Sequence, residues 1–472
     1  MSGNETSFDA VVIGSGVGGI CAAARLAHQG YRALVVESLD RIGGRASTRN
    51  VDGFLLNTGA LAIERGGPVE RTLREIGGPP LNLYVPKPET VLLWGRLDVN
   101  ASTGPVAWAR VAGPNVLKTI SAVLPPFRPK HGESVTEWLN RFTKSTIIHG
   151  LVDNVVGAFF AASGADLPAD VFLHYFTKGS SFKKIGFMPG GTIEVWKLFA
   201  AYVEAKGGAV WLNSPVKKIT FSEDGLASGV EVEREGKPVV VSAKYVISNV
   251  GPLATVKLAG VENFPAGYAE SVKKVTDPSA IITVHFASQK PLANFDGLAL
   301  AAHSRRLTYA GNFSAPEQKR TPAGWYLYCG ASTPRPARGE FDLENEKDLL
   351  FQDLREHFPG FDQAKILAID VTAHEWPAQR AVTGFDLPQA TPVANLWNVG
   401  DGVKPWGDAG TAACAETARI VVDQIVANDP VKRYAQVTQA AKAAPRRIPV
   451  PLTLGIVAGA AVAYGLYSRK RK

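Results

Sequence analysis

The sequence FDAVVIGSGVGGICAAARLAHQGYRALVVESLDRIGGR, residues 8–45, has the pattern of a strand, a helix and a second strand. An apolar run at 10–13 ends at a glycine cluster, CAAARLAHQ has the composition of a helix, and ALVVE that of a strand. Gly14, Gly16 and Gly19 have the spacing G-x-G-x-x-G, which suits a tight turn, close backbone approach to a pyrophosphate and helix packing on a strand. Free N–H groups at a helix N-terminus favour anions. The stretch therefore predicts a βαβ unit that binds a nucleotide.

The residues after the second strand say more about that nucleotide. Glu37 lies 18 residues beyond Gly19, where a carboxylate can accept hydrogen bonds from a ribose hydroxyl. A glycine triplet alone also occurs in ordinary turns, so the flanking strands and this acidic residue carry the prediction. Gly43 and Gly44 allow another close backbone approach, and Arg45 is a permanently charged, bidentate partner for phosphate.

The turn at 40–45, DRIGGR, resembles the second glycine-rich turn of the amine oxidase and phytoene desaturase superfamily of FAD enzymes. In that family the turn lies along the FAD pyrophosphate, and its arginine neutralises phosphate charge. The resemblance favours FAD over NAD. The next segment, GFLLNTGALAI at 53–63, is similar to the family's G-x-x-x-D-x-G segment beneath the flavin ring, with Gly59 retained and Asn57 in place of the usual aspartate.

Two later segments extend the resemblance. After GFMPGG we expect a helix from Thr192 to about Ala205 and a strand at 210–219, in which the family's valine, here Val216, holds the adenine through backbone groups. An ordinary helix–turn–strand is the alternative.

The last segment is NLWNVGDGVKPWGDAGTAACAETARIVVDQIV, residues 395–426. In it Gly400 and Asp401 follow an expected strand, and a helix is expected to begin near Gly410. The resemblance implies that Asp401 contacts the ribityl chain and pyrophosphate, and that the backbone at Gly410 and Thr411 faces the flavin N1/O2 edge. A helix N-terminus there would stabilise an anionic reduced flavin. Asp401 could instead be a turn residue.

These segments predict an α/β fold with a discontinuous, Rossmann-like FAD-binding domain of the GR2 type, an inserted α+β substrate domain and a C-terminal transmembrane helix. Ser134 to Glu137 suggest a capping box that opens a helix through Trp138 and Phe142. The FAD-binding domain is expected at 1–85, 186–261 and 376–430, the substrate domain at 86–185 and 262–375, a basic linker at 431–447, the anchor at 448–467 and a basic tail at 468–472.

Candidate reactive groups are few, and no convincing acid–base dyad stands out. Lys404, Trp406 and Asp408 lie between the expected flavin-binding aspartate and its helix, so each either reaches the ring or has a structural role. Cys414 lies in the first turn of that helix, where a thiolate would be favoured. Small-residue packing is the preferred interpretation of this cysteine, and a covalent flavin link is the alternative. In the expected substrate domain, aromatic residues either line an apolar channel or fill a helical core; they are Phe159, Phe160, Phe172, Tyr175, Phe176 and Phe182.

Composition excludes several classes of function. The three cysteines match neither a disulfide framework nor a zinc site, and the eight histidines show no metal-binding pairing, so no metal site is predicted. Nine Lys/Arg and no acidic residues follow Pro430, and removing these nine charges from the net +8 leaves −1. The basic charge therefore belongs to the tail and favours a membrane over nucleic acid.

The tail also contains a candidate membrane span. IPVPLTLGIVAGAAVAYGLY, residues 448–467, has 20 residues without a charge, about 30 Å as a helix, and basic residues on both sides. The N-terminal sequence MSGNETS has no export signal, so we expect a C-terminal anchor with the enzyme on the cytoplasmic face. Small residues spaced four apart, Gly455, Gly459 and Ala463, allow helix pairing and thus a homo-oligomer.

Three functional hypotheses follow. The first is a membrane-anchored FAD-dependent oxidoreductase that exchanges hydride with a lipophilic isoprenoid or polyene, as a desaturase, saturase or isomerase. The second is a membrane-bound amine or porphyrinogen oxidase. The third, from another class, is a non-catalytic flavin-binding membrane scaffold.

Overall fold

The computed structural model describes residues 6–94, 97–101, 124–177 and 184–429, with scattered positions between 103 and 121. The chain divides into two compact units, Met1–Val422 and Asp423–Lys472, and the first contains both large sheets. Within the described ranges, no helix is both long and apolar enough to cross a bilayer. The span expected at 448–467, with the linker before it and the tail after it, lies outside the described residues.

The first large sheet contains the nucleotide-binding pattern. Its described strands follow the order β10-β11-β12-β1-β2-β9, and β18 pairs with β12. β1 runs parallel to both β2 and β12, and its apolar residues are buried, as expected for a strand covered on both faces. The strands are β1 (Thr6–Ile13), β2 (Ala33–Val36), β9 (Ala209–Trp211), β10 (Val216–Phe221), β11 (Ala227–Arg234), β12 (Lys237–Ser248) and β18 (Leu396–Asn398).

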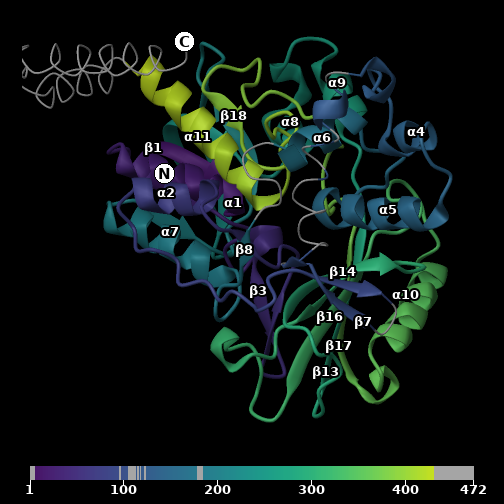
Figure 1. The fold of residues 1–472 in the computed structure, drawn as a ribbon. Coiled ribbons are helices and arrows are strands. Elements are labelled where there is room, and N and C mark those ends of the chain that lie inside the picture. The colour runs from purple at the N-terminus through teal and green to yellow at the C-terminus, as the bar shows by residue number, and fades with distance from the viewer. Residues whose placement is uncertain are drawn as a thin grey trace, which may run out of the picture. The chain divides into compact units, whose positions relative to one another are not determined.

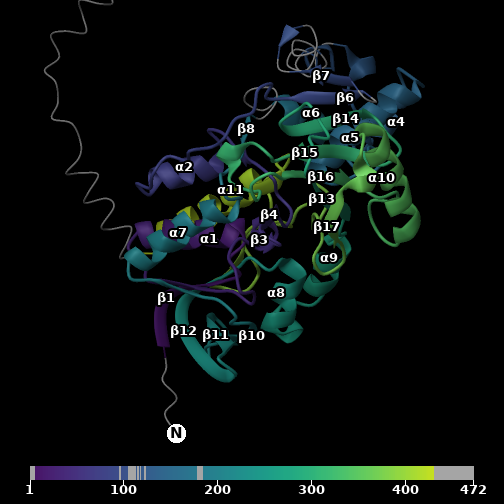
Figure 2. The same cartoon turned by 90° about the horizontal axis from the view of Figure 1, so that it is seen from below.

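Helices cover this sheet and complete the predicted βαβ unit. α1 (Val17–His28) connects the parallel strands β1 and β2, and its small residues from Cys21 to Ala24 are fully buried. α7 (Ile193–Ala205) lies beside α1 in both ribbon views, with Trp196 and Phe199 buried (Figures 1 and 2). The remaining helices of this half are α2 (Pro68–Glu75), α8 (Pro252–Ala259), α9 (Tyr268–Val275) and α11 (Gly410–Asn428).

The single strand expected at 210–219 is wrong. The chain forms two strands there, because Asn213 adopts a left-handed conformation with φ of 48° and Pro215 has no N–H group to donate. Asn213 donates its backbone N–H to the Leu39 carbonyl at 2.9 Å. The chain thus leaves β9 and re-enters the same sheet as β10, whose first residue is Val216.

The second large sheet is mostly antiparallel and has the order β17-β13-β16-β15-β14-β6-β7 among its described strands. One face packs on α10 (Leu343–His357), with Phe286, Leu354 and Phe358 fully buried between them. The strands are β6 (Val91–Trp94), β7 (Leu97–Asn100), β13 (Ile281–Ser288), β14 (Gly297–His303), β15 (Leu307–Asn312), β16 (Tyr326–Ser332) and β17 (Lys365–Thr372).

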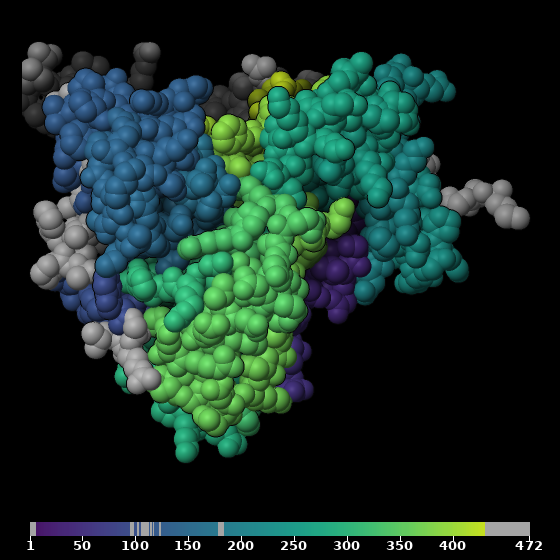
Figure 3. Space-filling view, turned by 90° about the vertical axis from the view of Figure 1, so that its right-hand side faces the viewer, coloured from purple at the N-terminus to yellow at the C-terminus, as the bar shows by residue number. Residues whose placement is uncertain are grey.

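A helical segment lies beside this sheet: α4 (Val135–Asn140), α5 (Thr146–Phe160) and α6 (Ala169–Thr177). The predicted capping box is confirmed, since Ser134 accepts from the Glu137 backbone and Glu137 accepts from the Ser134 backbone. The helix ends at Asn140, however, so Phe142 lies beyond it. On the face in Figure 3 this blue segment adjoins the green segment that carries α10 and β17.

Short strand pairs and 3₁₀ turns complete the described elements. Each large sheet draws its strands from the ranges expected for one of the two domains, although the domain boundaries stay a prediction. The short elements are β3 (Thr48–Val51), β4 (Phe54–Asn57), β5 (Ile63–Glu64), β8 (Ile185–Gly186), η1 (Gly44–Ala46), η2 (Pro125–Phe127), η3 (Val261–Asn263), η4 (Pro316–Gln318) and η5 (Phe361–Gln363).

Candidate functional site

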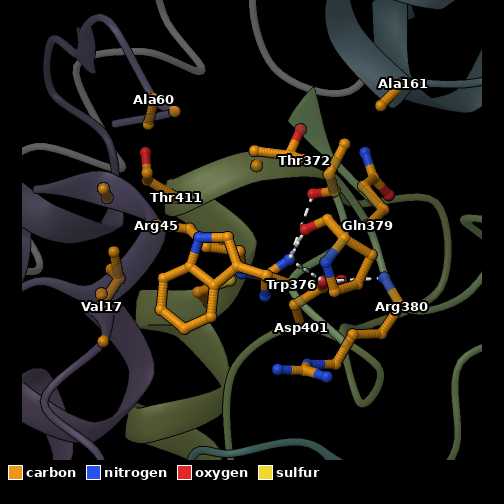
Figure 4. Close-up of a pocket in the computed structure, with 18 of the residues that line it drawn as sticks. Val17, Arg45, Ala60, Ala161, Thr372, Trp376, Gln379, Arg380, Asp401 and Thr411 are labelled. Atoms are coloured by element: carbon orange, nitrogen blue, oxygen red, sulfur yellow. Dashed lines mark hydrogen bonds and ion pairs between the residues drawn. The ribbon is translucent and has the colours of Figure 1, made fainter. Parts of the chain in front are cut away.

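A cavity of about 1550 Å³ extends from the carboxyl ends of the parallel strands to the face of the second sheet. It is larger than the roughly 300–1,000 Å³ that is typical of a site for one small ligand. Ligands of open α/β sheets bind at these strand ends. The cavity therefore has room for a dinucleotide and a second molecule, and Figure 4 shows part of its lining.

The two glycine-rich turns lie against each other in the cavity wall. Gly43 donates its N–H to the Ser15 carbonyl at 3.0 Å, and Gly16 and Gly43 form an isolated bridge. A Cβ atom on Gly16 would lie 2.4 Å from the side-chain amide of Asn249, so a larger residue would require that side chain to move. Because side chains are absent, the main chain of both turns is open to the cavity, as close contact with a pyrophosphate requires.

Two of the predicted glycines shape the turns without lining the cavity. A Cβ atom on Gly19 would lie 2.1 Å from the Gly14 carbonyl oxygen, which matches the packing role predicted for the third glycine. A Cβ atom on Gly400 would lie 2.4 Å from Asn249 Oδ1, and its φ is 88°. The predicted cofactor residues that do line the cavity are Gly14, Gly16, Glu37, Gly43, Gly44, Arg45, Gly59, Val216, Asp401, Gly410 and Thr411.

Glu37 is held in place at the end of β2. Its Oε2 accepts hydrogen bonds from the Ser15 N–H at 2.8 Å and the Ser15 hydroxyl at 2.6 Å, and its Oε1 accepts from the Leu39 N–H at 2.9 Å. The residue is buried but still lines the cavity. The carboxylate is thus fixed at the place where the sequence predicts a contact with ribose.

A cluster of five charged residues lies at the end of the cavity nearest the second turn. Arg45 Nη1 is 2.9 Å from Asp401 Oδ2, and Lys404 Nζ is 2.6 Å from Asp401 Oδ1 and 2.8 Å from Asp386 Oδ1. The Arg380 backbone N–H also donates to Asp401 at 2.8 Å. Figure 4 shows Arg45, Asp401 and Arg380 joined by these contacts. The three cations outnumber the two carboxylates, which suits a polyanionic pyrophosphate.

The same contacts settle the protonation of Asp401 and Lys404. Burial alone would raise the pKa of Asp401, but Lys404 and Arg45 together hold it well below its usual range. Burial alone would lower the pKa of Lys404, but Asp401 and Asp386 raise it above its usual range. Lys404 therefore stays protonated at neutral pH and cannot accept a proton. Its side chain, 1% exposed, is a structural cation.

The segment predicted to lie beneath the flavin ring is closely packed. A Cβ atom on Gly59 would lie 2.2 Å from the Arg45 carbonyl oxygen. Asn57 is buried; its Oδ1 accepts from the Thr48 hydroxyl at 2.9 Å and its Nδ2 donates to the Leu61 carbonyl at 3.2 Å. An aspartate could not make that donation, so the uncharged amide fits this position.

The other proposed reactive residues have different surroundings. Neither Trp406 nor Asp408 is among the described residues that line the cavity, and Trp406 is 51% exposed with its ring 4.7 Å from that of His174. Cys414 does line the cavity. Burial raises the pKa of its thiol to about 12, so the expectation of a favoured thiolate at the helix start is wrong.

Of the aromatic residues expected either to line an apolar channel or to fill a helical core, some do each. Phe160 and Phe176 are buried in the helical core, with Phe172 partly buried against it. Phe159 and Tyr175 line the cavity. The remaining member, Phe182, lies outside the described residues.

The second sheet supplies the opposite wall, which sequence reasoning missed. Alternate residues of β13, namely Ile281, Thr283 and His285, line the cavity, as do Asp370 and Thr372 of β17. His285 Nε2 lies 3.4 Å from Asp370 Oδ2. The alternation of β13 indicates one shared face, but a partner 85 residues away in the sequence carries no local signal.

No group of three or more His, Cys, Asp or Glu side chains suited to a metal ion occurs in the part of the chain that the structure describes.

Comparison with known families gives a match over most of the chain. The profile of the family described as flavin-containing amine oxidoreductase matches residues 17–417. The 15-cis-phytoene desaturase of Capsicum annuum is 24% identical over 447 residues, which cover 84% of this chain and 74% of that protein. The all-trans-retinol 13,14-reductase of Danio rerio is 24% identical over 297 residues, 52% of this chain and 47% of the relative, so the match spans about half of that protein.

Solved structures share the fold. An oxidoreductase from Methanosarcina mazei superposes with a TM-score of 0.76 at 25% identity, covering 88% of this chain and 99% of that one. Putrescine oxidase bound to putrescine superposes with a TM-score of 0.67 at 17% identity, covering 90% of this chain and 100% of that one. The second likeness shows the fold alone.

Proposed function

Because the chain belongs to the flavin-containing amine oxidoreductase family and is an FAD-dependent oxidoreductase, we propose that its substrate is a long apolar isoprenoid or polyene. The reaction would be hydride exchange between a substrate carbon and the flavin. Desaturation, saturation and isomerisation all fit this chemistry.

Residues that line the cavity would hold FAD. Glu37 and Val216 line the cavity, as do Arg45 and Asp401 of the charged cluster. When bound, FAD supplies a two-electron acceptor, while the protein provides orientation and a dry pocket. The N-terminus of α11 adds unpaired N–H groups at Gly410 that favour negative charge.

The observation that carries the substrate class is an apolar wall of the cavity. Phe159, Ile281, Leu298, Leu300 and Tyr309 all line the cavity there. Transfer of apolar surface into such a wall is favourable by about 25 cal/mol per Å². A long hydrocarbon would gain most from it, and the names of the phytoene desaturase and retinol reductase relatives support the same class.

The alternative of an amine or porphyrinogen oxidase has one observation in its favour. The carboxylates of Glu64, Glu89 and Glu375 also line the cavity and could attract a cationic amine. Glu89, however, already pairs with Arg65 at 2.5 Å. The putrescine oxidase likeness extends only to the fold.

Anaerobic mixing tests the proposal. The purified holoprotein would be mixed with phytoene in vesicles, putrescine or cyclohexylamine, and the photoreduced holoprotein with all-trans-retinol, while the flavin absorbance is followed. We expect phytoene to bleach the oxidised flavin or retinol to reoxidise the reduced one, with no response to amines. Bleaching by amines alone would exclude the isoprenoid proposal, and no response to any compound would favour the scaffold hypothesis.

The membrane tail supports the same substrate class, because tethering would hold the enzyme where a lipophilic substrate dissolves. We propose that residues 448–467 anchor the chain, with the catalytic unit on the cytoplasmic face. Truncation after Pro430 should release the protein into the soluble fraction. Continued sedimentation with membranes would contradict this anchor.

A further inference from the structure

The second-sheet wall of the cavity holds an imidazole beside a carboxylate. His285 lies on β13 and Asp370 on the adjacent antiparallel strand β17, and both residues line the cavity. His285 Nε2 is 3.4 Å from Asp370 Oδ2. Contacts of this kind are often long in ligand-free sites and tighten in complexes.

Asp370 is itself fixed from the other side. Its Oδ1 accepts a hydrogen bond from Arg49 Nη2 at 2.6 Å, which keeps it a carboxylate. Although burial alone would raise the pKa of Asp370, His285 and Arg49 hold it below its usual range. An ionised carboxylate can only accept, so Nε2 of His285 must carry the proton that it donates. In the neutral imidazole, Nδ1 is then the free acceptor.

The surroundings of His285 favour its neutral form. Burial is the main cause that lowers its pKa; Asp370 opposes this, and the cations Arg320 and Arg49 add to it. His285 is therefore neutral at pH 7, with a lone pair on Nδ1. An imidazole oriented by a carboxylate is the arrangement of a general base.

This pair is tied to the predicted cofactor site through a short stretch of chain. Arg49, which binds Asp370, lies four residues beyond Arg45, and four residues span at most roughly 14 Å. The chain leaving β17 also returns to Arg45, whose Nη1 donates to the Pro377 carbonyl at 2.6 Å. The pair and the charged cluster thus border the same cavity.

We propose that Nδ1 of His285 takes up the proton that accompanies hydride transfer, with Asp370 as its positioning residue; this rests on the proposed function. In a dehydrogenation, one carbon–hydrogen bond gives its hydrogen and electron pair to the oxidised flavin. The adjacent carbon–hydrogen bond then breaks; its proton goes to Nδ1, and its electron pair forms the new carbon–carbon double bond. In a saturation the same atom returns the proton as imidazolium.

The test compares His285→Gln and Asp370→Asn with the control His303→Gln, which changes an exposed histidine on β14. Each holoprotein would be mixed anaerobically with phytoene, or after photoreduction with all-trans-retinol, and the flavin rate followed against pH. For phytoene oxidation, proton uptake needs the neutral imidazole, so the wild-type rate should fall at low pH. His285→Gln should reduce the rate of flavin reduction roughly 10²–10⁴-fold, and its rate should no longer fall at low pH.

Asp370→Asn tests positioning. Because Asp370 raises the pKa of His285, its loss should move the acid limb of phytoene oxidation to lower pH and reduce the rate at neutral pH. A merely structural role would leave the pH profile in place. Equal rates and pH profiles for His285→Gln and the control would overturn the assignment while leaving the proposed function intact. A wild-type flavin that responds to neither compound would instead overturn both.

A measurement on the wild-type protein that needs no turnover tests the assignment even if a variant fails to fold. In wild-type protein with ¹⁵N-labelled histidine, the resonance assigned to His285 should show a neutral ring protonated on Nε2 at pH 7. A ring protonated on Nδ1, or an imidazolium, would overturn the assignment.

Discussion

Lys404→Met should destabilise the protein strongly, because it leaves two buried carboxylates without their shared cation. In the folded chain, Lys404 Nζ contacts Asp401 at 2.6 Å and Asp386 at 2.8 Å, and the side chains are 1%, 8% and 2% exposed, respectively. Removing one partner of a buried pair typically costs about 3–5 kcal/mol. The Met side chain has a similar length and adds no clash, so the cost is mainly electrostatic.

The expected fall in melting temperature follows from the size of the folded unit. At about 2.1 cal/mol/K per residue, residues 1–422 have an unfolding entropy of roughly 0.9 kcal/mol/K, so the loss corresponds to roughly 3–6 °C. Differential scanning calorimetry with saturating FAD would measure it. Lys365→Met is the matched control, because its pair with Asp52 is exposed and contributes only about 0–1 kcal/mol.

The pH dependence gives a second reading of the same interaction. The pKa of Asp401 is lower in the folded chain than in the unfolded chain. The ionised carboxylate therefore stabilises the fold above about pH 3.9, and this stabilisation is lost as the pH falls through the folded pKa. In Lys404→Met the folded pKa of Asp401 should lie closer to its unfolded value, so acidification should reduce the unfolding free energy less than in the wild type. A melting temperature within 1 °C of wild type at neutral pH, or an unchanged acid limb, would refute the reasoning.

Three other predictions concern the cofactor site. Gly59→Ala should abolish retention of FAD through purification, because the new Cβ atom would lie 2.2 Å from the Arg45 carbonyl oxygen. The control Gly150→Ala, at a position with open space around it, should keep the yellow colour of bound flavin. Retention of FAD by both variants would contradict this prediction. Asn57→Asp should cost about 1–3 kcal/mol in unfolding free energy, since the Leu61 carbonyl loses its donor, and an unchanged denaturation midpoint would argue against it. Acid precipitation should release all the flavin into the supernatant, because burial raises the pKa of the Cys414 thiol to about 12; flavin left in the pellet would indicate a covalent link.

Local patterns predicted the nucleotide-binding unit well, because each of its features is a short-range signal. The run at 10–13, the glycines after it and Glu37 together specify strand, turn, helix and strand end within one stretch. The break at Asn213 was missed because a positive φ on a non-glycine residue depends on the surrounding backbone.

Roles that depend on distant partners could not be read from sequence. Lys404 is close in sequence to Asp401 but also binds Asp386, and the two contacts together hold it as a buried structural cation. Cys414 lies at a helix start, yet burial outweighs the helix dipole. The His285 and Asp370 pair depends on the register between β13 and β17, which no local pattern specifies.

Extraction of the ligands that copurify with the protein tests the central claim most directly. The purified protein would be denatured, and the released molecules separated and identified by mass spectrometry. One cavity that holds FAD beside an apolar wall predicts one FAD per chain together with an isoprenoid or polyene. Release of no FAD, even after incubation with added cofactor, would contradict the account.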